Sequence, residues 1–122
     1  MVEYIALALV MTASTYGYSE QNCGDSGSPV DCSKGATTSS GEAFHPDTIP
    51  TAAVPAPVKQ RTRPMFVKIK AMNGSCVTIR VNDKSNERFI GKRGLDLTPA
   101  ALSALGIKPD RNWSGVLTEC EK

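Results

Sequence analysis

The chain has 122 residues, of which 40% are hydrophobic and 6% aromatic, so it is long enough for one small domain with a thin core built mainly from Val, Ile, Leu and Ala. The formal net charge is +2, and there is a single histidine. The sequence has no nucleophile-elbow motif and no glycine-rich phosphate loop, so nothing in it supports nucleophilic Ser or Cys catalysis or a phosphate site of that kind.

The first segment of the chain is apolar. Residues 4–13 are nearly all apolar, too few to span a bilayer, and small residues follow them. This pattern is typical of a secretory signal peptide, which we expect over residues 1–18 of a secreted or periplasmic protein without a stable membrane span. The start carries Glu3 and no Lys or Arg, whereas signal peptides usually begin with positive charge. The alternative is a buried first strand or helix.

The four cysteines indicate disulfides. An even number of cysteines in a small exported domain favours two disulfides, with three alternative pairings. We favour one disulfide that closes the Gly-, Ser- and Asp-rich loop over residues 19–35, and one that ties an inner strand to the last strand. These pairings are Cys23–Cys32 and Cys76–Cys120. No metal site or cofactor is expected, because there is no Cys-x-x-Cys pair and His45 is the only histidine.

A β-hairpin is the clearest structural signal. Five prolines within residues 46–64 permit only short extended pieces. Residues 66–72 then alternate apolar and Lys side chains, and residues 77–81 alternate again after Asn73-Gly74. Asn-Gly between two alternating runs predicts a type I′ turn. The register places Val77, Ile79 and Val81 on the core face, and Cys76 on the opposite one.

The second strand of this hairpin runs directly into Asn82-Asp83, where the alternation stops. A carboxylate at the end of a regular strand is held on a rigid base, as a catalytic acid requires. The alternative is that Asp83 only caps a turn, because Asn and Asp are common turn residues.

The last third of the chain predicts one helix and one strand. Thr98 can cap the helix and Pro99 suits its first position, so a short helix is expected over about 99–105, ended by Gly106. Residues 113–120 are expected to form the final strand.

Positive charge is concentrated in the middle of the chain. Ten Lys and Arg residues lie from Lys59 to Arg93, against only Asp83 and Glu87. This stretch favours an anionic polymer such as peptidoglycan or another acidic wall glycan. The alternative is a solvated face. Nucleic acid is not expected as a partner, because the sequence has no recognition helix, no zinc finger and no run of aromatic residues.

Several short motifs occur in an informative order: Ser40-Gly41-Glu42-Ala43-Phe44, Thr51-Ala52-Ala53, Val81-Asn82-Asp83, Leu95-Asp96-Leu97-Thr98-Pro99-Ala100-Ala101, and a strand with Val116 and Leu117. This order resembles the double-psi β-barrel domain of the rare lipoprotein A (RlpA-like) family, whose fold is shared with barwin, expansins, certain endoglucanases and MltA-type lytic transglycosylases. The resemblance covers about residues 36–121. It implies a mainly β domain over 36–122, a six-stranded double-psi β-barrel with the one short helix.

The resemblance also implies site residues. Asp83 matches the acidic residue that related barrels use as general acid on a glycosidic oxygen, which must stay protonated near neutral pH. Glu42 matches a glutamate near the groove and could supply the like charge that favours protonation. Asp96 matches the Asp-Leu segment before the helix, and we interpret it as structural, buried and hydrogen-bonded to loop amides.

Within residues 36–121 this chain departs from the family at two places, and no lipobox follows the apolar run at its start. Val54 stands where the family has histidine after Thr-Ala-Ala, and Lys84-Ser85 replaces Arg-Gly. His45 lies nine residues before Val54 and is a candidate to fold back toward the groove. The expected substrate contacts are His45, Lys68, Lys84, Arg88 and Lys92.

Two function classes follow. The first is a secreted peptidoglycan lytic transglycosylase in which Asp83 serves as both general acid and general base, as in the MltA-type mechanism, where the sugar's own hydroxyl attacks and no histidine is needed. The alternative is a non-catalytic glycan-binding or wall-loosening module, or a secreted protease inhibitor of the same fold. A binder would keep the groove and the basic stretch without needing a protonated Asp83.

Overall fold

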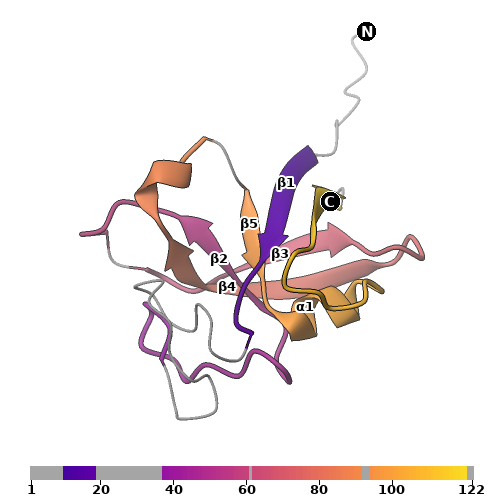
Figure 1. The fold of residues 1–122 in the computed structure, drawn as a ribbon, viewed down its shortest axis with the longest axis horizontal. Coiled ribbons are helices and arrows are strands. Elements are labelled where there is room, and N and C mark those ends of the chain that lie inside the picture. Colours follow the sequence, from indigo (N-terminus) through magenta and orange to yellow (C-terminus); the bar gives the residue numbers. More distant parts are fainter. Residues whose placement is uncertain (1–9, 19–36, 61, 92–93, 121–122) are drawn as a thin grey trace, which may run out of the picture.

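The computed structural model describes residues 10–18, 37–60, 62–91 and 94–120 (Figure 1). In these residues the chain forms a six-stranded mixed sheet, one short α-helix and a 3-10 turn. The elements are β1 (Val10–Thr15), β2 (Thr51–Pro55), β3 (Met65–Lys70), β4 (Cys76–Ser85), η2 (Glu87–Phe89), β5 (Leu95–Leu97), α1 (Pro99–Ala104) and β6 (Ser114–Thr118).

The sheet is curled, and its strand order is β3-β4-β2-β5-β1-β6. β2 is parallel to β4 and β1 is parallel to β5, while the other neighbours are antiparallel. The two outermost strands meet at one point, where Ile69 forms an antiparallel bridge with Glu119 and the Cys120 N–H donates to the Lys68 carbonyl at 2.8 Å. The expected mainly β class with six strands and one short helix is therefore confirmed.

The predicted hairpin is confirmed, but its turn is longer than expected. β3 and β4 pair from Met65↔Val81 to Lys70↔Cys76, which leaves five connecting residues, 71–75. The Asn73 side chain accepts the Ser75 N–H at 2.9 Å, and Gly74 has a φ of 88°, which favours glycine. The Asn-Gly pair therefore shapes a five-residue connection instead of a two-residue type I′ turn.

β1 comes from the segment that the sequence places in a signal peptide over residues 1–18. β1 lies between β5 and β6, and pairs with both. Ala13 is 4% exposed and packs in the core. In the structure Val10–Thr15 therefore form an inner strand of the sheet, while the expected signal peptide over residues 1–18 stays a prediction. Residues 1–9 and the whole expected loop 19–35 lie outside the described residues.

The main core fills the concave side of the sheet. It consists of Ala13, Ala52, Ile69, Ala71, Ile79, Val81, Leu95, Leu97, Ala101, Leu102, Leu105 and Leu117. Helix α1 confirms the helix expected at 99–105: the Thr98 hydroxyl accepts the Ala101 N–H at 3.2 Å, and Gly106 follows with a φ of 81°. α1 thus contributes its apolar side to the core.

The predicted Cys76–Cys120 disulfide is present, with the Cα atoms 6.1 Å apart. It ties the first residue of β4 to the segment after β6. Val77 and Ile79 point to the core side of β4, whereas Cys76 points to the other side, where it can reach Cys120. Cys23 and Cys32 lie outside the described residues, so their pairing stays a prediction. No helix in the described part of the chain is long and apolar enough to cross a membrane.

Candidate functional site

Asp83 lies inside β4 and not in a turn after it. Ala52 pairs with Val81, but the next residue, Ala53, pairs with Asp83, so Asn82 is an extra residue in β4. Such a β-bulge re-aims the side chains that follow it. Because Ala52 and Val81 face the core, the bulge turns Asp83 to the convex face, on the side of Ala53. This is why the alternation stops at Asn82.

A row of paired residues crosses four strands on this convex face. Asp83 of β4 pairs with Ala53 of β2, Ala53 pairs with Asp96 of β5, and Asp96 pairs with Ser14 of β1. Two strand spacings place the backbones of the two aspartates about 10 Å apart. Asp96 is buried, as expected, and the Ser14 hydroxyl is one of its donors. The small Ala53 leaves room between the two carboxyl groups.

Tyr16 fills that room. Its ring stacks on Phe44 with the centroids 5.5 Å apart, and the two form a small apolar cluster with Ala53. Its hydroxyl donates to Asp83 Oδ2 at 3.2 Å. Burial raises the pKa of Tyr16 well above 10.0, and the charge and hydrogen bond of Asp83 raise it further, followed by the charge of Asp96. Tyr16 therefore stays a hydrogen-bond donor at neutral pH.

Tyr16 was not expected at the site, because the pattern of residues 1–18 predicts a leader. The sequence has no clear signal for it, since the requirement for a glycine at position 17 is visible only in the structure. Gly17 has a φ of 91°, and a Cβ there would lie 2.9 Å from the Pro46 Cβ and 3.0 Å from the Phe44 ring. A side chain at position 17 would therefore be strained and would clash with the segment that packs on Tyr16.

Three donors from three segments hold Asp83. Oδ1 accepts the Ser39 N–H at 3.0 Å and the Lys84 N–H at 2.9 Å, and Oδ2 accepts the Tyr16 hydroxyl. Asp83 is 0% exposed. These bonds fix the orientation of the carboxyl group, and burial keeps it out of reach of a substrate in this conformation.

Glu42 is held by Arg80. The Arg80 Nη2 lies 2.7 Å from Glu42 Oε2, and its Nε donates to both carboxylate oxygens at 3.0 and 3.1 Å. The hydrogen bond from Arg80 lowers the pKa of Glu42. The role expected for Glu42, a like charge that keeps Asp83 protonated, does not fit this arrangement, because Arg80 neutralises that charge. Glu42 instead anchors the loop over residues 37–45 to β4, where the Ser40 N–H also donates to the Asn82 carbonyl at 3.2 Å.

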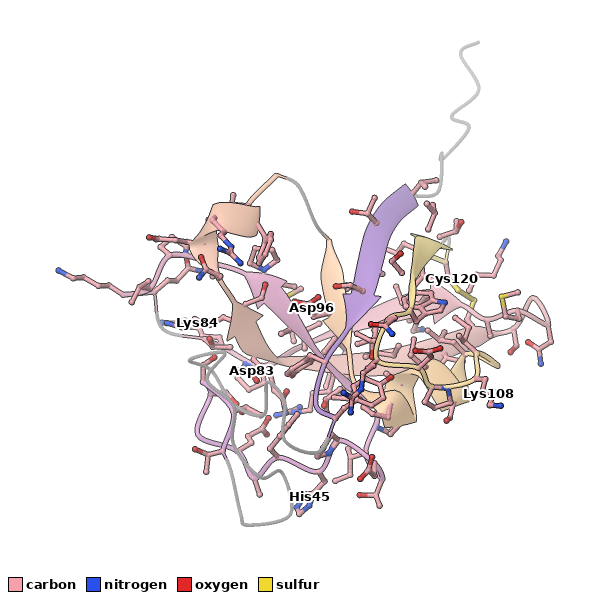
Figure 2. The ribbon with its side chains drawn as sticks, in the orientation of Figure 1. His45, Asp83, Lys84, Asp96, Lys108 and Cys120 are labelled. Atoms are coloured by element: carbon pink, nitrogen blue, oxygen red, sulfur yellow. A yellow bond between two sulfur atoms is a disulfide. The ribbon has the colours of Figure 1, made fainter. Side chains whose placement is uncertain are left out.

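His45 does not lie beside Asp83, as a residue that replaces the histidine of the RlpA-like pattern would have to. Figure 2 shows His45 well separated from Asp83. The side chain is exposed, and the His45 carbonyl accepts the N–H groups of Thr48 and Ile49.

The expected basic contacts lie on separate elements. The Lys84 ammonium group donates to the carbonyls of Val58 and Gln60, so it holds the loop before β3. Lys68 is exposed on β3. Arg88 is exposed in η2, with its guanidinium 4.7 Å from the centre of the Phe89 ring. The remaining contact, Lys92, lies outside the described residues.

The described residues contain no group of three or more His, Cys, Asp or Glu side chains that could hold a metal ion. Comparison of the chain with protein-family models gives no match, and comparison with curated proteins gives none either. The fold and the site therefore define a mainly β domain with a curled mixed sheet, in which a buried Tyr16–Asp83 pair lies under the 37–45 loop.

Proposed function

We propose that this chain is a secreted or periplasmic domain of the RlpA-like, double-psi β-barrel type that binds cell-wall glycan without cleaving it. The observation that carries the choice of binder over enzyme is the environment of Asp83, which is 0% exposed and occupied by three donors of the chain itself. A general acid or base must come within hydrogen-bond reach of the substrate, directly or through one water. Asp83 as folded serves instead as an acceptor that joins three segments.

The sheet supports the double-psi assignment. Counted from β3 to β6, the pairings are antiparallel, parallel, antiparallel, parallel, antiparallel. This alternation of antiparallel and parallel pairings is the same when counted from either edge of the sheet, as expected for the pseudo-twofold symmetry that double-psi barrels often have. The family-like motifs also fall on corresponding places, with Thr51–Ala53 in β2 and Leu95–Leu97 in β5, the two strands that form the central antiparallel pair.

Two further features support a wall glycan outside the cytoplasm. The Cys76–Cys120 disulfide is compatible with an oxidising compartment. The excess of Lys and Arg between residues 59 and 93 favours an acidic polymer such as peptidoglycan.

The test is sedimentation with insoluble peptidoglycan, followed by analysis of the supernatant for released muropeptides. The wild-type protein is expected to sediment, less so as salt screens its exposed charges over about 8–10 Å. Neither the wild type nor Asp83→Asn is expected to release muropeptides, and the two should bind alike. If the wild-type protein does not sediment with peptidoglycan, the proposal that it binds this polymer is refuted.

The lytic transglycosylase is the second candidate, because the bulge at Asn82 turns Asp83 toward Tyr16, and bulges often re-aim side chains beside active sites. In that case the wild type releases muropeptides, and Asp83→Asn lowers the rate about 10²–10⁴-fold.

A further inference from the structure

The convex side of β3 is exposed, unlike the region of Asp83. Phe66, Lys68 and Lys70 alternate with Val67 and Ile69, and only the latter two point to the core side. Phe66 is 60% exposed, and both lysines are exposed. Their partners on β4 are Arg80, Thr78 and Cys76. We call the convex surface formed by Phe66, Lys68, Lys70, Thr78 and Arg80 the β3 face.

The charge of the β3 face is not balanced. Among the described residues no acidic side chain forms an ion pair with Lys68 or Lys70, and Glu42 is engaged by Arg80. Glu119 is near in the ladder, but it pairs with Ile69 and so lies on the side opposite to the lysines. Two neighbouring ammonium groups on a rigid strand therefore form a site of positive potential.

The spacing along β3 suits an extended polymer. Alternate residues on a strand are about 7 Å apart, so Phe66 and Lys70 lie about 14 Å from each other with Lys68 between them. The Arg80 guanidinium lies 5.1 Å from the centre of the Phe66 ring, a cation–π contact that leaves most of the side chain exposed. An exposed aromatic ring next to two cations can bind the apolar side of a sugar ring together with adjacent carboxylates.

We propose that the β3 face is the docking surface for peptidoglycan, with carboxylates of its peptide stems on Lys68 and Lys70 and one sugar ring of its glycan chain stacked on Phe66. This inference rests on the proposed glycan-binding function and names the surface that performs it. The surface excludes two of the cations expected from the sequence, because the Lys84 ammonium group is bonded to loop carbonyls and Arg88 lies in η2.

The probes are peptidoglycan with its carboxyl groups intact and the same peptidoglycan after its carboxyl groups are amidated. Lys68→Gln/Lys70→Gln is expected to weaken binding to intact peptidoglycan by more than about twofold and by at most about 25-fold, because each of the two exposed ion pairs contributes at most about fivefold. The same variant should bind the amidated material like the wild type. Phe66→Ala is expected to weaken binding to both materials.

The matched control is Lys108→Gln/Arg111→Gln, which removes the same charge from exposed positions before β6. It should stay within about twofold of the wild type, and all variants should keep the wild-type circular dichroism spectrum. Suppose that the wild type binds and that Lys68→Gln/Lys70→Gln loses no more affinity than the control variant. The assignment of the β3 face as the docking surface is then wrong, while the proposed function stands. If the wild type binds neither material, the proposed function itself fails.

Discussion

Removing the Asp83 carboxyl group is expected to destabilise the domain strongly. Asp83→Ala leaves the Tyr16 hydroxyl and the N–H groups of Ser39 and Lys84 without their acceptor. A buried donor without a partner costs about 1–3 kcal/mol, and the two amides are partly accessible, so we take the low end for each and expect a loss of about 3 kcal/mol. That is a large share of the stability of a small domain, which is about 5–15 kcal/mol.

Asp83→Asn is expected to cost only about 1 kcal/mol, because its carbonyl oxygen can accept both amides and the Tyr16 hydroxyl can turn to accept from its NH₂ group. The assay is urea unfolding at neutral pH, with the midpoints compared at equal m-value. Asp47→Ala, at an exposed position, is the control and should stay within about 0.5 kcal/mol of the wild type. An Asp83→Ala variant as stable as this control, or an Asn variant as damaged as the Ala variant, would refute the assignment of Asp83 as a three-way acceptor.

Three further predictions follow from β1, the disulfide and Tyr16. Deleting residues 1–18 removes β1, the strand between β5 and β6, and should abolish cooperative thermal unfolding. Deleting residues 1–9 leaves β1 and should preserve it. Equal melting curves for the two deletions would contradict the position of β1 inside the sheet. Cys76→Ser/Cys120→Ser should lower the free energy of unfolding by up to about 4 kcal/mol in the chain-entropy model, because the crosslink spans 44 residues; an unchanged urea midpoint would argue against this contribution. Because the fold raises the pKa of Tyr16 above 10.0, its contribution to stability is complete below that pH and is lost as the pH rises further. The melting temperature of Tyr16→Phe should therefore fall less steeply than that of the wild type between about pH 9 and about pH 12, and parallel curves would contradict this.

The sequence by itself determined the elements whose signals are local. The β3–β4 hairpin follows from two alternating runs, and α1 follows from Thr98, Pro99 and Gly106, because side-chain periodicity and capping depend on neighbouring residues alone. The Cys76–Cys120 disulfide could also be favoured in advance, because the strand pattern places the Cys76 side chain on the face opposite to the core. The place of Asp83 at an interruption of the alternation was also readable in advance.

Only the tertiary structure decided the features that depend on pairing between distant segments. The apolar residues of β1 favour a leader when the sequence is considered alone, and only their register with β5 and β6 makes them part of the sheet. Tyr16 meets Asp83 from 67 residues away, and Glu42 meets Arg80 from 38 residues away. The face that Asp83 takes depends on the pairing of β4 with β2, since one extra residue in a strand exchanges the two faces for every residue that follows. A chain read along its length contains the residues of this site, but strand register brings them together.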